Sequence, residues 1–252
     1  MDYETLDVEI GANGVVSLAL NAPEKRNALN DDLVAALDAF FADLPEQTRA
    51  IVISGTGGHF SSGLDLSQHV ARQPLDVMAH SRNWHRVMAR IAHSPVPVVA
   101  AMSGAVMGGG LEFAAAYHVR VAEETVRFQM PEGLRGIFVG GGGSVRISRL
   151  IGTDRLTEMM LTGRTLSADE GERVGLAHYR VAEGEGEAKA RELAASIAQN
   201  SQLSNWAMVS AMSRIDSMSM DDGLFTESLV AGMTQTNPEV QARIGQFLNR
   251  KK

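Results

Sequence analysis

The most informative absence in this 252-residue sequence is cysteine, of which there is none. Without cysteine the chain can form no disulfide, offer no thiolate nucleophile and build no Cys-ligated zinc site. The absence leaves the redox compartment open, because a cysteine-free chain folds in oxidising and in reducing surroundings. Any chemistry must therefore come from other side chains or from the backbone.

The sequence is also short of positive charge. It has 23 Lys and Arg against 30 Asp and Glu, a formal net charge of −7, and a pI near 5.5. A protein that binds nucleic acid needs clustered Lys and Arg to neutralise the phosphates. We therefore expect no nucleic-acid partner.

Long apolar segments and targeting signals are not apparent. An uncharged stretch at residues 95–111 is shorter than the about 20 apolar residues of a membrane helix, and Pro95, Pro97 and Gly104 interrupt it. The first ten residues are acidic and show neither the basic nor the apolar region of a signal peptide. We expect a soluble, cytoplasmic protein with no membrane partner.

Several motifs of known chemistry are missing as well. The sequence has no G-x-x-x-x-G-K-[ST] or G-x-G-x-x-G phosphate loop, no G-x-S-x-G nucleophile and no H-E-x-x-H zinc site. His80 and His85 are five residues apart, which places them off a single helix face. We expect no metal and no bound cofactor.

The hydrophobic pattern of the first hundred residues predicts strands. Leu6, Val8 and Ile10 alternate with polar residues and predict a strand with these three side chains on one face. The apolar runs at 50–53 and 97–102 predict buried strands.

Helices are predicted between and after these strands. Asn30 is a good N-cap, and helices are expected at 75–92 and 111–117. Ser167 and Glu170 have the spacing of a capping box. From residue 144 onward the pattern is mostly helical, so the sequence predicts an α/β fold followed by a C-terminal helical region.

The first candidate for chemistry is Glu112, which follows three glycines. A predicted strand runs through Gly108, Gly109 and Gly110 into a helix, where backbone amides can approach a ligand and the helix dipole favours negative charge. The same glycines also fit a close strand-to-helix crossing without any ligand. Burial of Glu112 among apolar neighbours would raise its pKa toward that of a general acid or base, whereas an exposed Glu near a helix N-terminus is equally ordinary.

Two further segments can complete such a site. Glu132 lies between Pro131 and Gly133, in a context typical of a fixed loop. Residues 59–66 form a glycine-rich loop after the strand at 50–53, and ligands of α/β sheets bind at the carboxyl ends of strands. Two carboxylates with separated pKa values can share acid and base work. Each segment alone is also compatible with an ordinary loop.

Taken in order, these segments resemble the enoyl-CoA hydratase/isomerase (crotonase) superfamily. The resemblance extends over about residues 5–182 and rests on the segments 21–30, 60–66, 95–112, 131–132, 141–143 and 161–168. It implies an α/β fold built as a spiral of ββα turns, with a crotonase-like core domain at 1–182. It also implies a C-terminal helical region at 183–252 that is used in oligomer contacts, in a homotrimer or homohexamer.

The resemblance further implies hydration of a 2-enoyl-CoA thioester to a 3-hydroxyacyl-CoA. Glu112 would position and deprotonate water, and Glu132 would protonate the α-carbon. The backbone amides of Leu64 and Gly109 would form an oxyanion hole for the thioester oxygen, each contributing about 3–4 kcal/mol to the transition state. Coenzyme A is part of the substrate, so no separate cofactor is expected.

The acyl-CoA substrate is strongly anionic whereas the protein is acidic, so attraction must be local. The resemblance places Lys25 and Arg26 in the segment that approaches CoA, and the basic end at 250–252 is a second candidate for a phosphate contact. Both basic clusters also fit solvated surface. The residues that the resemblance assigns to substrate or CoA binding are Lys25, Arg26, Ala28, Ser62, Gly63, Asp65, Leu66 and Gly108.

Departures from the family pattern leave other reactions open. Met130 and Val139 replace a small residue and a proline, and the glycine run at 140–143 is unusually rich, so the Glu132 loop is expected to suit a particular acyl group. The alternatives are a Δ3–Δ2 enoyl-CoA isomerase, another crotonase-type acyl-CoA reaction, or a non-catalytic acyl-CoA binding protein. The pair of glutamates favours the hydratase, because similar single-acid isomerases usually keep only one.

Large apolar residues of the helices are expected to pack in the core or between subunits rather than to line an acyl pocket. They are Met208, Met212, Met218, Met220, Met233, Trp84 and Trp206.

Overall fold

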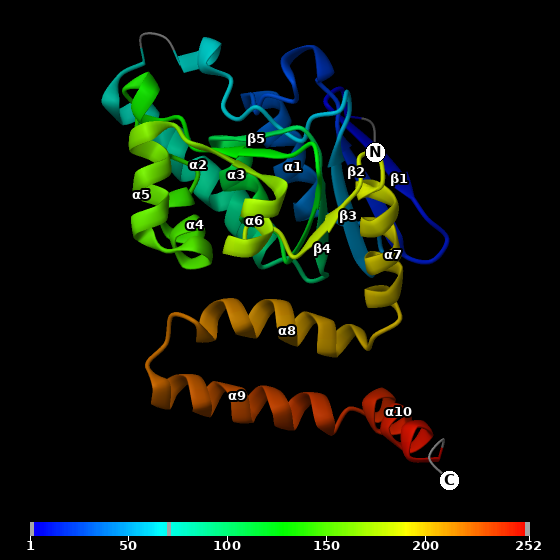
Figure 1. Cartoon of the computed structure of the whole chain (residues 1–252). Helices are drawn as coiled ribbons and strands as arrows, with labels where there is room; N and C mark the ends of the chain where they lie inside the picture. Colours follow the sequence, from blue (N-terminus) through cyan, green and yellow to red (C-terminus); the bar gives the residue numbers. More distant parts are fainter. Residues whose placement is uncertain (1–2, 70–71, 250–252) are drawn as a thin grey trace.

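The computed structural model describes residues 3–69 and 72–249, and its main element is a six-stranded sheet (Figure 1). The first two strands form an antiparallel hairpin, and every later neighbouring pair is parallel. In sheet order the strands are β1 (Leu6–Ile10), β2 (Val15–Leu20), β3 (Ala50–Gly55), β4 (Val98–Met102), β6 (Val119–Glu123) and β9 (Tyr179–Val181).

A second sheet of three short strands carries the segments nearest the candidate site. Its order is β5 (Ala105–Met107), β7 (Arg127–Gln129), β8 (Thr165–Ser167). An isolated bridge between Ser61 and Val106 adds the glycine-rich loop to the free side of β5. The loop after β3 and the glycines after β5 therefore lie next to each other, although they are far apart in the sequence.

Helices surround the two sheets. Asn30 accepts a hydrogen bond from Leu33 N at 2.8 Å, and Ser167 and Glu170 form the capping box, so both predicted caps are confirmed. Short 3-10 helices occupy Pro23–Lys25, Leu66–His69 and Gly133–Arg135. The α-helices are α1 (Asp31–Ala42), α2 (Pro74–Ala92), α3 (Gly109–Ala114), α4 (Gly143–Ile151), α5 (Thr153–Thr162), α6 (Ala168–Val174), α7 (Gly186–Ala198), α8 (Gln202–Ile215), α9 (Met220–Gln235) and α10 (Pro238–Asn249).

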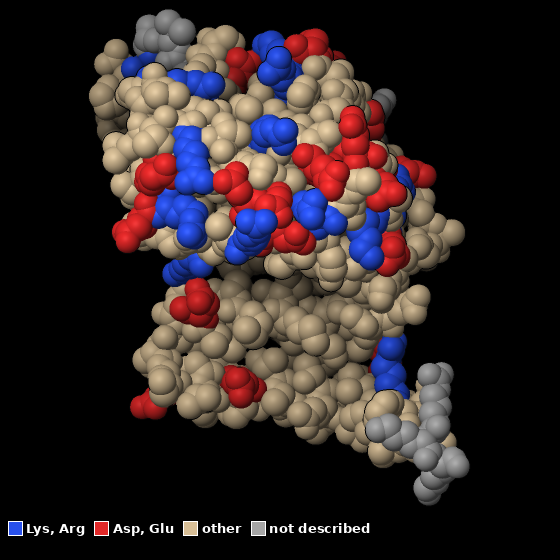
Figure 2. Space-filling model, viewed as in Figure 1, with Lys and Arg blue, Asp and Glu red and all other residues tan. Residues whose placement is uncertain are grey.

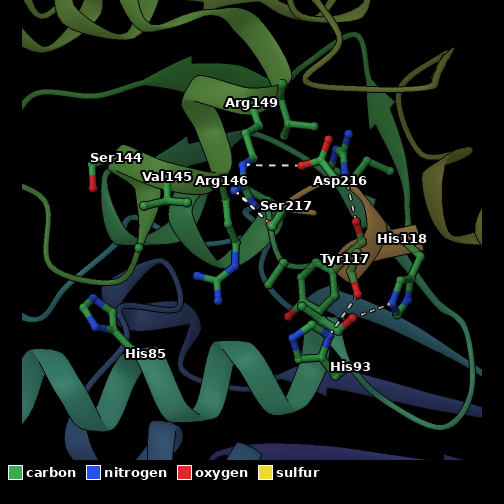
Figure 3. A pocket seen from close by; sticks show the side chains of 17 residues that line it. His85, His93, Tyr117, His118, Ser144, Val145, Arg146, Arg149, Asp216 and Ser217 are labelled. Carbon is green, nitrogen blue, oxygen red and sulfur yellow. Dashed lines mark hydrogen bonds and ion pairs between the residues drawn. The ribbon is translucent and has the colours of Figure 1, made fainter. Parts of the chain in front are cut away.

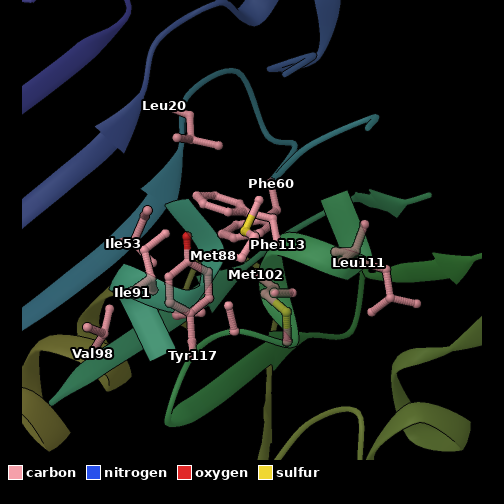
Figure 4. Packing of buried hydrophobic residues seen from close by; sticks show 14 of the residues in the cluster. Leu20, Ile53, Phe60, Met88, Ile91, Val98, Met102, Leu111, Phe113 and Tyr117 are labelled. Atoms are coloured by element: carbon pink, nitrogen blue, oxygen red, sulfur yellow. The ribbon is translucent and has the colours of Figure 1, made fainter. Parts of the chain in front are cut away.

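The main core lies between one face of the large sheet and the helices α1, α2 and α3 (Figure 4). Phe60, Phe113 and Tyr117 form an aromatic cluster there, with ring centroids 5.9 Å apart for Phe60–Phe113 and 4.9 Å for Phe113–Tyr117. Such pairs add about 0.5–1.5 kcal/mol each beyond area burial. This cluster fixes α3, and with it the position of Glu112.

The opposite face of the sheet is covered by α7. Ala190, Ala194 and Ala198 recur at helical spacing and pack against Val52 and Val99 in a second buried cluster. The predicted boundary at residue 183 thus assigns α7 to the C-terminal helical region, although α7 packs on the large sheet. The helices that project from the core are α8, α9 and α10 (Figure 1). Their use in oligomer contacts stays a prediction.

The core and the C-terminal helices α8, α9 and α10 differ in the charge on their surfaces. The face seen in Figure 2 carries many charged side chains over the core and few over the C-terminal helices. The five methionines named above are 39% to 81% exposed, so the expectation that they pack in the core of this chain is wrong. Trp84 is buried at 3% exposure and Trp206 is 41% exposed. Packing of the methionines between subunits stays a prediction.

Two local expectations need correction. Ile10 is 64% exposed although Leu6 is buried, because Ile10 ends β1 at the tip of the hairpin, whereas Leu6 belongs to the main core cluster. The helix predicted at 111–117 begins at Gly109 and ends at Ala114, since glycines form its first turn. In the described ranges no helix is long and apolar enough to cross a membrane.

Candidate active site

The backbone amides of Leu64 and Gly109 lie side by side. A Cβ atom added to Gly109 would be 3.1 Å from Leu64 N, and one added to Gly63 would be 3.0 Å from Gly109 N. Gly63 and Gly108 have φ values of +92° and +49°, a region that favours glycine. No described residue accepts a hydrogen bond from either amide. Two adjacent free N–H donors are therefore available to a ligand oxygen.

Buried polar side chains hold the Leu64 loop in this place. Asn27 is fully buried, and its amide donates to Thr56 O at 2.9 Å and His59 O at 2.7 Å. Ser61 is also buried, and its hydroxyl donates to Asn27 O at 2.8 Å and accepts from Gly63 N at 3.1 Å. These bonds leave the next amide, that of Leu64, unused by the fold.

Glu112 is buried in α3, with 4% of its surface exposed. Its Oε1 atom accepts hydrogen bonds from Gly141 N at 2.8 Å and Gly143 N at 2.7 Å. Gly143 is the first residue of α4, so the carboxylate also lies at the positive end of that helix. Burial raises the pKa of Glu112 and the amide hydrogen bonds lower it; burial has the larger effect, so the pKa is above its usual value.

Glu132 is equally buried, at 5% exposure, but its carboxyl group is poorly satisfied. No described residue forms a hydrogen bond with its Oε2 atom. Burial is the main cause that raises the pKa of Glu132 to about 7, and the nearby charge of Glu112 adds to the rise. Near neutral pH the protonated and ionised forms of this carboxyl group are therefore both populated.

Both carboxyl groups and both free amides line one small cavity. Its volume is about 40 Å³, and its lining includes Leu64, Gly108, Gly109, Glu112 and Glu132. The structure thus brings together the catalytic and oxyanion residues predicted from the sequence. The chemical roles of these residues stay predictions.

An apolar cavity of about 210 Å³ adjoins this site and shares Leu64, Leu66 and Glu112 with it. Two polar side chains in its lining are already engaged: His80 with Asp31 at 2.9 Å and Ser81 with Gly140 O at 2.6 Å. The apolar lining is formed by Leu66, Val77, Trp84, Ile137 and Phe138. This cavity suits an apolar group attached to whatever the two amides bind.

The predicted CoA-binding segments also lie side by side. Ser62 N donates to Arg26 O at 2.9 Å, and Ser62 Oγ donates to Lys25 O at 2.9 Å. Lys25 Nζ is 2.8 Å from Asp65 Oδ2. The hydrogen bond from Lys25, with a second one from Ser67, lowers the pKa of Asp65 to about 2.

Arg26 is exposed, Ala28 and Ser62 are half-buried, and Leu66 is 38% exposed. The basic end at 250–252 lies outside the described residues.

Sequence reasoning did not assign functions to several residues that shape the site. Gly141 and Gly143 supply the amides that bind Glu112, and Trp84 packs against the site, with its ring 3.1 Å from a Cβ added to Gly109. For Gly141 and Gly143, the signal available in the sequence was the unusually rich glycine run at 140–143. Nothing in the sequence around Trp84 indicates this position.

Comparison with known proteins identifies the family of the chain. The sequence profile of the family described as enoyl-CoA hydratase/isomerase matches residues 11–252. A Mycobacterium tuberculosis protein named "Probable enoyl-CoA hydratase echA8" is 32% identical over 229 residues, which are 90% of this chain and 88% of that protein. A Bacillus subtilis protein, the enoyl-CoA hydratase/isomerase candidate YngF, is 33% identical over 186 residues, 73% of this chain and 72% of its own.

Solved structures agree with these sequence matches. A candidate enoyl-CoA hydratase from Rhodopseudomonas palustris is 49% identical, with a TM-score of 0.95 over 99% of this chain and 96% of that one. An enoyl-CoA hydratase from Bacillus anthracis is 27% identical, with a TM-score of 0.92 over 98% and 97%. The order of the motifs, the fold and the matched length agree, and the chain belongs to the enoyl-CoA hydratase/isomerase family within the crotonase superfamily.

Proposed function

We propose that the protein adds water to a 2-enoyl-CoA thioester and forms a 3-hydroxyacyl-CoA. The observation that carries this proposal is the pair of buried carboxyl groups, Glu112 and Glu132, which line one cavity with two free backbone amides. Hydration needs a base for water, an acid for the α-carbon and donors for the thioester oxygen. The cavity offers groups suited to all three tasks.

The thioester oxygen binds between Leu64 N and Gly109 N. Attack on the β-carbon moves electron density onto this oxygen, and the two donors stabilise that charge. A single donor of this kind contributes about 3–4 kcal/mol in other enzymes. The geometry is held by the backbone, so little reorganisation is needed as the charge develops.

Glu112 accepts a proton from the attacking water, and the oxygen of that water bonds to the β-carbon. Glu132 donates its proton to the α-carbon, which completes the addition of one water molecule. Glu112 is then protonated and Glu132 ionised, and proton transfer through the next water restores the starting state. The different environments of the two carboxyl groups support this division of roles.

The apolar cavity of about 210 Å³ receives the acyl chain, and Lys25 and Arg26 attract the phosphates of CoA. Burial of an apolar acyl group contributes about 25 cal/mol per Å² of surface removed from water. We also propose that the apolar faces of α8, α9 and α10 form contacts in a homotrimer or homohexamer. Size-exclusion chromatography with light scattering tests this second proposal, and a monomer at micromolar concentration would contradict it.

The catalytic proposal is tested by following the ultraviolet absorbance of a short 2-enoyl-CoA as hydration removes its conjugation. Wild-type protein should deplete it, and Glu112→Gln and Glu132→Gln should each lower kcat by about 10²–10⁴-fold. Normal turnover in either variant would contradict the proposed roles.

A parallel assay with a 3-enoyl-CoA separates the alternatives. Isomerisation that survives Glu112→Ala, with negligible hydration in the wild type, would favour an isomerase. Binding of acyl-CoA esters without turnover across a broad panel of acyl groups would favour a non-catalytic binding protein.

A further inference from the structure

The glycine loop at 140–143 holds Glu112, and side chains from two helices hold the loop in turn. Ser81, on α2, donates through Oγ to Gly140 O at 2.6 Å. Arg146, on α4, donates through Nη1 to Gly141 O at 3.1 Å. The two carbonyl groups that receive these bonds flank the amide that binds Glu112.

The bond from Ser81 acts on the same peptide unit that binds Glu112. Gly140 O and Gly141 N belong to one peptide group, so the Ser81 hydroxyl, this peptide and the Glu112 carboxylate form a chain of hydrogen bonds. Each bond in such a chain polarises the next and strengthens it. Ser81 therefore both orients the Gly141 amide and makes it a better donor.

Arg146 fixes the adjoining peptide unit, between the two amides that bind Glu112. Gly142 has a φ of +99°, and a Cβ atom at this position would collide with Arg146 Nη1. The guanidinium group thus packs directly against a backbone conformation that only glycine adopts readily. One side chain holds the turn that presents Gly141 N and Gly143 N to the same carboxylate oxygen.

From these contacts we propose that Ser81 and Arg146 are positioning residues, a clamp that keeps the glycine loop on Glu112 and so orients its carboxylate to accept a proton from water. This inference rests on the proposed hydration reaction. Neither side chain lines the small cavity that holds Glu112 and Glu132. The clamp therefore acts on kcat through Glu112. Arg146 lines neither this cavity nor the apolar cavity, so its loss should have little effect on KM, whereas Ser81 also lines the apolar cavity.

The far side of the clamp faces a separate cavity of about 570 Å³, between the core and α8 (Figure 3). Arg146 points into this cavity with His85 and Arg149 around it. Arg149 is a matched control, because it lies three residues along the same helix but pairs with Asp216 at 3.4 Å and donates to Ser217 at 3.2 Å. Those partners belong to the end of α8 and not to the glycine loop.

The clamp also predicts a change in pH dependence. The amide hydrogen bonds from the glycine loop lower the pKa of Glu112. The other groups that act on Glu112 are His85 on α2 and Arg146 on α4, which favour its ionised form, and Glu132, whose charge opposes it. Loss of the clamp frees the loop and weakens the amide bonds, so the pKa of Glu112 rises. Arg146→Ala also removes a nearby positive charge, whereas Ser81→Ala changes the hydrogen bonds alone. Because Glu112 must be ionised to accept a proton, the acid limb of the rate profile moves to higher pH.

The test compares Arg146→Ala, Ser81→Ala and Arg149→Ala in hydration of a short 2-enoyl-CoA between about pH 5 and 9. We expect Arg146→Ala to lower kcat by about 10–100-fold, as loss of supporting residues does elsewhere, with KM changed less than about twofold. Ser81→Ala should move kcat and the acid limb in the same direction by a smaller amount. Arg149→Ala should leave both unchanged.

Chemical rescue separates positioning from general damage. Guanidinium chloride at about 20 mM, far below denaturing concentrations, can enter the open cavity and should restore part of the kcat of Arg146→Ala but not of Ser81→Ala. Wild-type kcat in Arg146→Ala, an equal loss in Arg149→Ala, or a raised KM at unchanged kcat would overturn the proposal. Should Arg146→Ala not fold, Ser81→Ala decides, and wild-type kcat in that variant overturns the clamp.

The clamp can also be tested apart from the reaction. Titration of the Glu112 carboxyl by ¹³C NMR should show a higher pKa in Arg146→Ala and Ser81→Ala than in the wild type. An unchanged pKa in Ser81→Ala, which removes no charge, would overturn the clamp even in an active hydratase. A raised pKa in that variant, in a protein without hydratase activity, would support the clamp and overturn the proposed function alone.

Discussion

Glu112 and Glu132 share a cavity and are buried to the same extent, yet the fold treats them differently. Glu112 receives two backbone amides on one oxygen, from a loop that is itself held by side chains. Glu132 has an oxygen without any described partner. Equal burial therefore produces two different acids. The ionised form of Glu112 is supported by two amide donors, whereas burial and the charge of Glu112 outweigh the weaker effects of the Glu132 backbone and Arg135, so Glu132 keeps its proton to higher pH.

This contrast supports Glu112 as the base and Glu132 as the acid. A base must be ionised before the reaction, and preorganised amides favour that form. An acid must hold its proton near the working pH, which an unpaired buried carboxyl group does. The difference between the two sites, rather than burial itself, carries the assignment.

The largest expected effect concerns the pH dependence of hydration. Under the proposed function Glu132 must be protonated, and its pKa is raised to about 7, so kcat/KM should fall about tenfold per pH unit above that value. Steady-state rates with a 2-enoyl-CoA between pH 6 and about 9 check this. If kcat/KM stayed constant up to the highest pH, Glu132 could not be the acid, and the proposed difference between the two carboxyl groups would be wrong.

The next effect is on stability. Glu112→Ala leaves the amides of Gly141 and Gly143 without an acceptor and should lower the free energy of unfolding by about 2–4 kcal/mol. Glu132→Ala removes an unsatisfied group and should change it by less than about 1 kcal/mol. Urea unfolding of both variants at neutral pH measures the difference. Equal losses would show that the two carboxyl groups are equally well satisfied.

A smaller effect appears in the pH dependence of stability. The pKa of Glu132 is raised from 4.5 to about 7 on folding, so between these values the folded chain keeps a proton that the unfolded chain has lost. The contribution of Glu132 to stability therefore falls as pH rises through this window. As the pH rises from 4.5 to above 7, the free energy of unfolding of Glu132→Gln should increase by about 2 kcal/mol relative to that of the wild type, allowing for solvent screening. A pH-independent difference would contradict the raised pKa.

The smallest effect involves a third carboxylate, Asp65, which lies at the opposite extreme because its pKa is lowered to about 2. Its partner Lys25 is exposed and attracts CoA under the proposed function. Lys25→Ala should raise KM for a 2-enoyl-CoA about two- to fivefold at unchanged kcat, and less so in high salt. Lys189→Ala, which removes a similar 2.8 Å ion pair on α7, is the control and should change neither constant.

Part of this site could be predicted from the sequence. The apolar neighbours of Glu112 were compatible with burial, although an exposed Glu near a helix N-terminus was equally ordinary, and the ordered motifs indicated the fold. The partners of Glu112 could not be found in this way. Gly141 and Gly143 lie 29 and 31 residues further along, and no local pattern specifies which carboxylate their amides bind.

The C-terminal part shows the same limit. The alanines of α7 recur at helical spacing, a pattern that favours close packing on a sheet. The packing of α7 against the core could therefore have been predicted from the sequence. The methionines of α8 and α9 form apolar faces as well, but a pattern does not say whether such a face packs within the chain or on another copy. Their exposure in one chain could be established only by the structure.

The position of Trp84 has a practical consequence. Its ring lies against the backbone of Gly109 and of Gly141, which belong to the two halves of the site, whereas the second tryptophan, Trp206, is exposed on α8. Replacing Trp206 by phenylalanine would leave a single indole at the reaction centre. Its fluorescence would then report ligand binding and motion of the glycine loop in real time, so the protein carries its own optical probe.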